Sequence, residues 1–123
     1  HDRFRVFPSL RFDAFLTLLH HARVIVGNSS AGIREAPIYG VPSIDIGTRQ
    51  RGRHDHPTIV HTGSSVEDIR AGLTAALEMP RGPSSLHFGQ GDSARRFCEL
   101  LAGDAIWALG SDKVFLDLMF SSD

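Results

Sequence analysis

The sequence predicts an α/β fold, in which a parallel β-sheet carries helices on both of its faces. Short apolar runs alternate with segments whose apolar residues recur every three or four positions, the pattern of strands that alternate with helices. One apolar run, Val24-Ile25-Val26, is of the β-branched kind that a buried parallel strand needs. Since each connection between parallel strands carries a helix across the sheet, we expect three layers, α on β on α.

The chain is expected to open with a strand and an amphipathic helix. Residues 4–7 are a short apolar run, and Asp13 is placed to cap the helix that follows. Apolar residues recur through this helix at three- and four-residue spacing: Phe12, Phe15, Leu16, Leu19 and Ala22.

Three more strands complete the predicted sheet. They lie at residues 24–26, 41–46 and 58–61, and a helix near residues 31–39 joins the first two. Pro37 breaks this helix early unless the proline falls within the first turn. Four strands in total are few for an independent domain of this class.

The second half is predicted to be mainly helical. Ser64 or Ser65, followed by two acidic residues, marks the start of a helix that runs to Leu77. The cluster of Pro, Gly and Ser at residues 79–85 must be a loop. Two last helices are predicted, one at Ser93–Leu101 that ends at Gly103, with Phe97, Leu100 and Leu101 facing inward, and one at residues 112–120.

Composition indicates one globular domain of 123 residues, with 41% hydrophobic and 22% charged residues. The net charge of −1 gives no general attraction to nucleic acid or acidic membranes. No apolar run approaches the ~20 residues of a membrane span, and no signal peptide opens the chain. The lone Cys98 cannot form an internal disulfide, which fits a reducing cytosol. We therefore expect a cytoplasmic protein that binds neither nucleic acid nor membrane.

A loop of small residues, Gly27–Gly32, follows the strand at residues 24–26 and indicates a phosphate site. Small side chains let backbone amides approach a ligand, and the next helix would aim its free N–H groups at the same place. Ser29 and Ser30 can add hydroxyl donors, although either one could simply cap the helix. The loop is neither a G-x-G-x-x-G fingerprint nor a P-loop.

Charged residues on both sides of this loop extend the prediction to a nucleotide diphosphate. Glu35 lies about one turn into the helix, where nucleotide-binding folds often hold a ribose hydroxyl, although it could also be a surface acid. Arg49, Arg51 and Arg53 follow the strand at residues 41–46, so they leave the sheet at the same edge.

Other chemistry is not expected. His54 and His56, with Asp55 between them, could supply metal ligands, but no third ligand has suitable spacing, so we predict no metal. Ser29 lacks the G-x-S-x-G setting of a hydrolase nucleophile. The G-x-G loop at residues 89–91 is a weaker candidate for phosphate binding, and a hinge or cleft-edge role suits it better.

Residues 28–53 resemble the nucleotide-binding segment of the UDP-N-acetylglucosamine 2-epimerases, and of their hydrolysing branch in particular. The shared pattern is N-S-S-x-G-I/V-x-E followed by G-x-R-Q-x-G-R. Residues 7–12 and 89–94 are also similar to segments of that family. The resemblance implies two Rossmann-like halves of the GT-B type. This chain would be a partial C-terminal domain, about residues 4–103, with residues 112–120 as a crossover helix. The remaining strands and the catalytic N-terminal half would precede His1.

The resemblance also implies roles for particular residues. Ser29, Ser30 and Arg49 would bind the diphosphate, Glu35 the ribose, and Phe15 would lie beside the uracil ring although its spacing places it in the core. Of the other two arginines, only Arg53 matches a position of the family, so the implied nucleotide-binding set is Phe15, Ser29, Ser30, Glu35, Arg49 and Arg53.

The implied reaction eliminates UDP from UDP-N-acetylglucosamine to a glycal and then adds water, giving N-acetylmannosamine, a step toward sialic acid. It needs no cofactor, and the enzyme is expected to be a homo-oligomer. The carboxylates that transfer protons would lie in the other half, so this chain should bind nucleotide without turnover. Three alternatives stay open: the donor-binding domain of a GT-B glycosyltransferase, an interaction domain without a ligand, and a substrate built on GDP or on diacetylbacillosamine.

Overall fold

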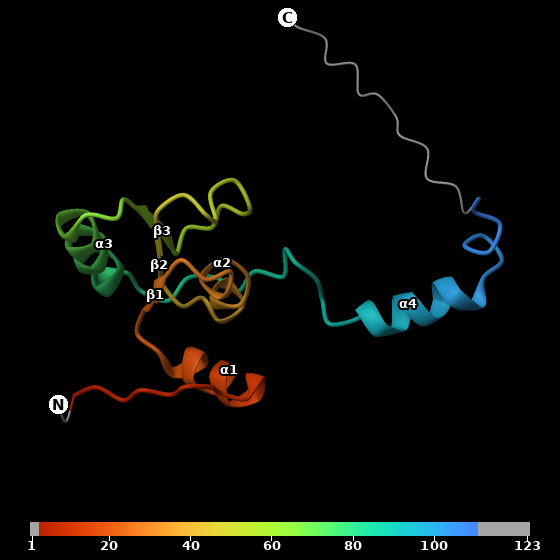
Figure 1. Cartoon of the computed structure of the whole chain (residues 1–123), viewed down its shortest axis with the longest axis horizontal. Helices are drawn as coiled ribbons and strands as arrows, with labels where there is room; N and C mark the ends of the chain where they lie inside the picture. The colour runs from red at the N-terminus through yellow and green to blue at the C-terminus, as the bar shows by residue number, and fades with distance from the viewer. Residues whose placement is uncertain (1–2, 111–123) are drawn as a thin grey trace, which may run out of the picture. The chain divides into compact units, whose positions relative to one another are not determined.

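The computed structural model describes residues 3–110. The chain divides into two units with the boundary after Phe88, and each unit is described by itself. The first unit contains α1 (Phe12–His21), β1 (Ile25–Gly27), α2 (Ala31–Arg34), the 3-10 helix η1 (Ala36–Tyr39), β2 (Ser43–Ile46), β3 (Ile59–Thr62) and α3 (Val66–Glu78), and the second contains α4 (Ser93–Ala102) (Figure 1).

The sheet is parallel throughout and has the order β1-β2-β3. Ser43 of β2 is aligned with Ile25 of β1 and with Ile59 of β3. The connection from β1 to β2 carries α2 and η1, whereas β2 and β3 are joined by the loop of residues 47–58, which contains no helix. The predicted α/β fold is therefore confirmed as part of a Rossmann-like domain.

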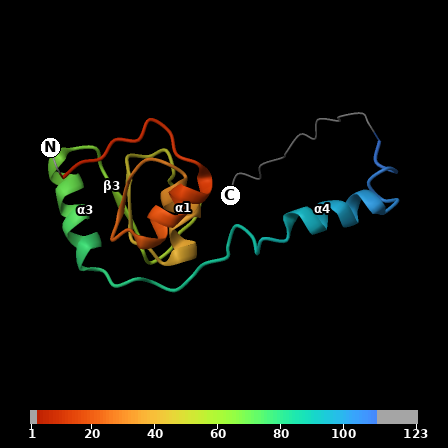
Figure 2. The same cartoon turned by 90° about the horizontal axis from the view of Figure 1, so that it is seen from below.

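Helices cover both faces of this sheet, with α1 and α3 on opposite sides (Figure 2). Gly72 of α3 packs on one face, where a Cβ would lie 2.4 Å from Cγ2 of Thr62. Gly32 of α2 packs on the other, where a Cβ would lie 3.5 Å from Cβ of Ser43. The core beneath α1 is formed by Leu19, Ala36 and Val41, with Phe15, Ala22, Ile25 and Tyr39 packed around it.

The predicted strand at residues 4–7 is wrong, because no strand forms before α1 in the described residues. Val6 is 89% exposed and Phe7 is 52% exposed. An apolar run becomes a strand only when a neighbour accepts its backbone hydrogen bonds. β1 pairs with β2 alone, so no strand of the described residues lies along its other edge.

Two helix boundaries also differ from the prediction. α1 begins one residue before Asp13, which pairs with Arg11 at 2.8 Å and caps nothing. The predicted helix at residues 31–39 is divided into α2 and η1, and Pro37 lies in the first turn of η1. A proline lacks an N–H, so it fits at the start of a new helix rather than inside an old one.

Predictions for the following segments are confirmed. Ser65 caps α3, and its Oγ accepts a hydrogen bond from the Asp68 N–H at 3.1 Å. Residues 79–85 contain neither helix nor strand. α4 ends before Gly103, as expected.

The apolar face of α4, predicted to point inward, is not covered by the other described residues of its own unit. Phe97, Leu100 and Leu101 are 60%, 55% and 38% exposed. Periodicity identifies an apolar face, but it does not supply the layer that would cover it. The helix predicted at residues 112–120 lies outside the described residues. Among residues 3–110, no helix has the length and apolar character to cross a membrane.

A return segment, residues 81–88, runs back over η1. The Gly82 N–H donates to the Gly40 carbonyl at 2.9 Å, and the Ser85 N–H donates to the Pro37 carbonyl at 3.0 Å. Gly40 has a φ of 62°, and a Cβ there would lie 2.1 Å from the Gly82 carbonyl oxygen. Glycine at residue 40 is therefore required both by conformation and by contact.

Candidate functional site

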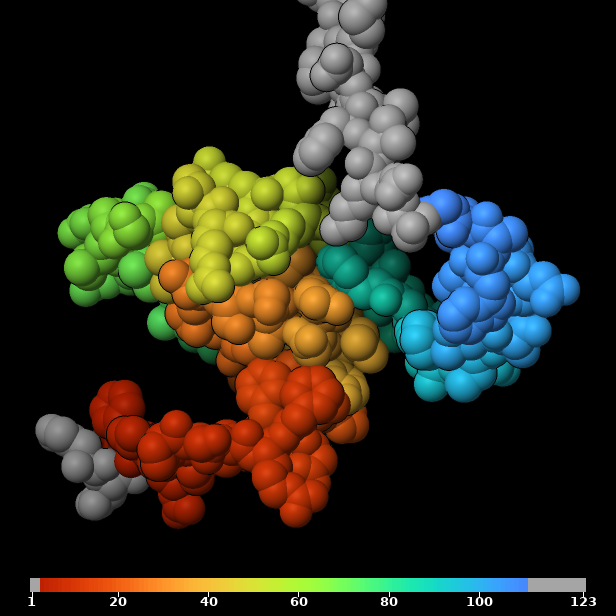
Figure 3. All heavy atoms as spheres, turned by 45° about the vertical axis from the view of Figure 1, so that its right-hand side comes forward, coloured from red at the N-terminus to blue at the C-terminus, as the bar shows by residue number. Residues whose placement is uncertain are grey.

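The candidate site is built on the loops that leave the carboxyl ends of β1 and β2. Because the two strands are parallel neighbours, their following loops open at the same sheet edge. In Figure 3 the yellow atoms of the β2–β3 loop lie directly against the orange atoms of the segment that follows β1. The predicted phosphate loop and the arginine loop are thus brought together.

The loop after β1 leaves polar groups available to a ligand. Oγ of Ser29 accepts a hydrogen bond from the Ala31 N–H at 3.3 Å, which is a local cap. The side chain of Ser30, the N-cap residue of α2, makes no capping bond. The cavity beside Gly27 and Ser29 measures about 30 Å³, which is room for one water molecule. A phosphate would therefore have to lie over the loop rather than beneath it.

Glu35 lies at the junction of α2 and η1, behind this loop. Its Oε2 is buried and has no hydrogen-bond partner in the part of the chain that the structure describes. A buried carboxylate oxygen without a donor is costly, and a ligand hydroxyl would remove that cost. This environment differs from that of a fully solvated surface acid.

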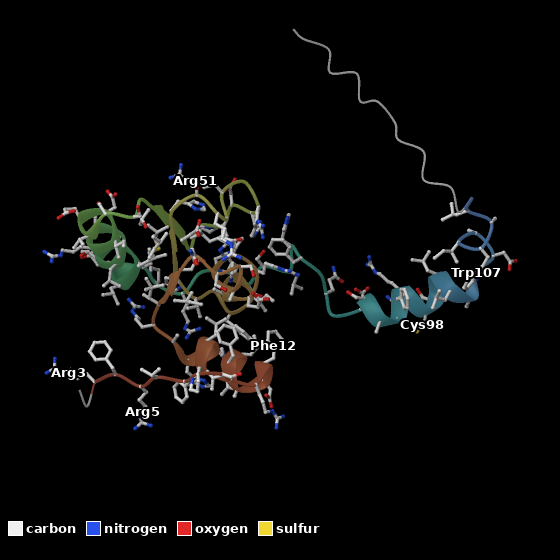
Figure 4. The ribbon with its side chains drawn as sticks, viewed as in Figure 1. Arg3, Arg5, Phe12, Arg51, Cys98 and Trp107 are labelled. Atoms are coloured by element: carbon white, nitrogen blue, oxygen red, sulfur yellow. The ribbon has the colours of Figure 1, made fainter. Side chains whose placement is uncertain are left out.

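The arginines of the β2–β3 loop are all exposed: Arg49, Arg51 and Arg53. Within residues 3–110 none of their side chains has a hydrogen bond or an ion pair to the protein. Figure 4 shows Arg51 pointing away from the sheet. Their charge is free to meet an anion, and the structure does not rank Arg49 or Arg53 above Arg51.

Phe15 is half-buried on α1, where it packs against the cluster of Leu19, Ala36 and Val41. Its ring stacks on that of Phe12 with centroids 6.5 Å apart. The core position expected from spacing is therefore confirmed. A contact with a base remains a prediction for the exposed part of the ring.

Sequence reasoning missed Gln50. This side chain is only 1% exposed, although it lies between two exposed arginines. Its Nε2 donates to the Asn28 carbonyl at 2.9 Å, which joins the two loops. A polar residue among arginines looks like part of a solvated loop, and only its place in the G-T-R-Q run gave a signal.

Sequence reasoning also missed Asp45, which lies within the apolar run of β2. The Asp45 side chain is 2% exposed, and its Oδ2 contacts Nδ1 of His61. Its register partner on β1 is Gly27, so the acid lies next to the start of the phosphate loop. A single acid in an apolar run is also common in exposed edge strands, so the sequence did not indicate that Asp45 is buried.

Histidines gather where the arginine loop meets the return segment. The rings of His54 and His87 stack with centroids 4.1 Å apart, and Phe88 meets both edge-on. Burial lowers the pKa of His54, and the neighbouring His87 and His56 lower it further, while Asp55 opposes them. Among residues 3–110, no three His, Cys, Asp or Glu side chains are grouped to hold a metal ion.

Known proteins share the sequence of most of this chain. The family model described as UDP-N-acetylglucosamine 2-epimerase matches residues 1–102. A UDP-N-acetylglucosamine 2-epimerase of Neisseria meningitidis serogroup B is 46% identical over 120 residues, covering 95% of this chain and 32% of that protein.

Two more distant relatives carry the word hydrolyzing in their names. A UDP-N,N'-diacetylbacillosamine 2-epimerase (hydrolyzing) of Legionella pneumophila is 30% identical over 101 residues, covering 82% of this chain and 27% of that protein. A GDP/UDP-N,N'-diacetylbacillosamine 2-epimerase (hydrolyzing) of Campylobacter jejuni is 43% identical over 65 residues, covering 53% of this chain and 16% of that protein. This chain therefore spans about a third or less of the length of these relatives.

Proposed function

The chain belongs to the UDP-N-acetylglucosamine 2-epimerase family, and from this premise we propose that it is the nucleotide-binding part of a hydrolysing epimerase. The domain would be the partial C-terminal, Rossmann-like half of a GT-B-type protein, and its ligand a UDP sugar. The observation that carries the proposal is the buried, unpartnered Oε2 of Glu35 behind a loop of free polar groups. A ribose hydroxyl is the donor that this oxygen lacks.

The proposed roles follow from what each group leaves unpaired. Ser29, Ser30 and the loop amides would donate to the diphosphate, and Arg49 and Arg53 would neutralise its charge. Phe15 would contact the base with its exposed part. No cofactor or metal is required for these roles.

The proposed reaction eliminates UDP and then hydrates the glycal to N-acetylmannosamine. Negative charge grows on the departing diphosphate, and donors that are already oriented toward it would stabilise the transition state. The groups that transfer protons are proposed to lie in the other half of the longer, homo-oligomeric protein. The hydrolysing branch is supported by the G-x-R-Q-x-G-R run and by the names of two relatives.

Calorimetric titration with UDP tests the site. The wild-type chain should give a binding isotherm that is lost in Ser30→Ala/Arg49→Ala, since each charge-assisted contact contributes about 1.5–3 kcal/mol. Ser64→Ala/Arg70→Ala changes exposed residues of the same types and should bind like wild type. Equal affinity in the two double variants would exclude this site.

The same titration with other ligands tests the substrate class. GDP and the N,N'-diacetylbacillosamine nucleotide should bind more weakly than UDP and UDP-N-acetylglucosamine. A reversed order would move the proposal toward the diacetylbacillosamine enzymes named among the relatives.

A further inference from the structure

We propose that Gln50 is a positioning residue, which orients the backbone of the phosphate loop so that the Ser29 N–H faces the diphosphate. This inference rests on the proposed function. Its starting point is an unusual environment, because Gln50 is 1% exposed while Arg49 and Arg51 beside it are exposed. The loop turns this one side chain inward.

The inward side chain bonds to a single target in the neighbouring loop. Nε2 of Gln50 donates to the Asn28 carbonyl at 2.9 Å, across 22 positions of sequence. Within residues 3–110 no other side-chain hydrogen bond joins the segment 28–30 to the β2–β3 loop. Beyond the pairing of β1 with β2, this bond is therefore the side-chain link between the two halves of the site.

The bond also fixes which way one peptide faces. The Asn28 carbonyl and the Ser29 N–H belong to the same planar trans peptide, so they point in opposite directions. Holding the carbonyl toward Gln50 turns the Ser29 N–H away from it. In the described residues the Ser29 N–H has no protein acceptor, so it is available to a ligand. A flipped peptide would present a carbonyl oxygen to the phosphate and repel it.

Stability alone does not explain a glutamine at residue 50. Its Oε1 is buried and has no partner among the described residues. An unsatisfied amide oxygen is a cost that an apolar side chain of the same length would avoid. The glutamine is therefore explained by the donor group of its amide, which orients the Asn28 carbonyl.

The arginine loop also has backbone hydrogen bonds of its own. The Arg53 N–H donates to the Gln50 carbonyl at 3.3 Å, and the Arg51 N–H donates to the Thr48 carbonyl at 3.2 Å. These bonds shape the turn, and the Gln50 side chain joins that turn to the segment at Asn28. Gln50 acts on the ligand through these groups and does not touch it.

Gln50→Met tests the proposal, because methionine keeps the length but has no donor. Amide spectra by NMR and UDP titrations are compared for the wild-type chain, Gln50→Met and the control Glu78→Met, which changes an exposed residue at the end of α3. Without ligand, Gln50→Met should shift the amide resonances of residues 28–31 and leave those of α3 unchanged. Its dissociation constant for UDP should rise at least tenfold, whereas Glu78→Met should match wild type.

The outcomes separate this inference from the proposed function. UDP affinity within twofold of wild type would overturn the role of Gln50, as would resonance shifts spread over the whole sheet, which mean a structural role. If the wild-type chain binds no UDP, the proposed function fails, and the resonances of residues 28–31 still decide whether Gln50 holds the loop. If Gln50→Met does not fold, Gln50→Leu, which is also apolar and lacks the donor, takes its place with the same two measurements.

Discussion

Nδ1 of His61 lies 2.8 Å from Oδ2 of Asp45 and joins β3 to the middle strand of the sheet. The two residues are register partners, and their side chains lie on the face opposite α3. Asp45 is nearly inaccessible to water, whereas the histidine is 30% exposed. A carboxylate is thus kept inside the sheet by one neighbour that reaches solvent.

Removing that neighbour should destabilise the fold. His61→Ala leaves the carboxylate of Asp45 buried without a donor, and we expect it to lower the free energy of unfolding by about 1–3 kcal/mol. Urea denaturation followed by circular dichroism measures the change. His21→Ala, at an exposed position of α1, should change stability by less than about 0.5 kcal/mol. Equal stability of the two variants would show that the pair contributes nothing.

Gly40→Ala should be more destabilising than Gly52→Ala, although both glycines have positive φ values of 62° and 73°. The strain of that conformation is shared, but only the Cβ at residue 40 meets the Gly82 carbonyl. Overpacking of this kind costs about 1–3 kcal/mol. The difference between the urea midpoints of the two variants reports it, and no difference would mean that the return segment moves aside freely.

Acidification should weaken the fold through His54. Burial, His87 and His56 hold its pKa below the ordinary value of about 6.5, so the unfolded chain takes up the proton more readily. This contribution to stability is complete above about pH 6.5 and is lost as the pH falls through the lowered folded-state pKa. His54→Gln should flatten the dependence of the urea midpoint on pH between 7.5 and 5, whereas Thr74→Gln, which removes no titratable group, should not. An unchanged slope in His54→Gln would contradict this.

Glu35→Gln tests the proposed ribose contact. The amide keeps the shape and one acceptor but loses the charge, so UDP binding should weaken by about 1–2 kcal/mol. Calorimetry with UDP and 2′,3′-dideoxy-UDP measures the discrimination, which should be strong in wild type and reduced in Glu35→Gln. Glu67→Gln, an exposed acid of α3, is the control. Identical discrimination in wild type and Glu35→Gln would mean that Glu35 does not contact the ribose.

The chain alone should bind UDP-N-acetylglucosamine without converting it. Of the acids near the predicted site, Glu35 has a buried oxygen and Asp45 is buried in β2 with His61 as its partner, so neither is an exposed proton-transfer group. Incubation should release neither UDP nor N-acetylmannosamine above a control without protein. Turnover that increases with protein concentration would show that the proton-transfer groups lie within this chain.

Local signals in the sequence were enough for part of the fold. Ser65 and its acidic neighbours predicted the start of α3, because a cap is satisfied within one turn. The apolar run of residues 4–7 failed, because strand formation depends on a partner elsewhere. Gln50 was missed for the same reason, since its acceptor lies 22 positions away. The site residues are within a motif, but what holds them in place is a property of the assembled loops.

The return segment limits how far the first unit can be trimmed. α3 ends at Glu78, and a polypeptide cut there would keep all three strands. It would also lose the guanidinium of Arg81, which donates to the carbonyls of Tyr39, His20 and Ala22. The hydroxyl of Ser84, which donates to the Ile38 carbonyl, would be lost as well. The smallest autonomously folding version should therefore extend to Phe88. If the chain were cut where α3 ends, the truncated protein would leave carbonyls of η1 facing water.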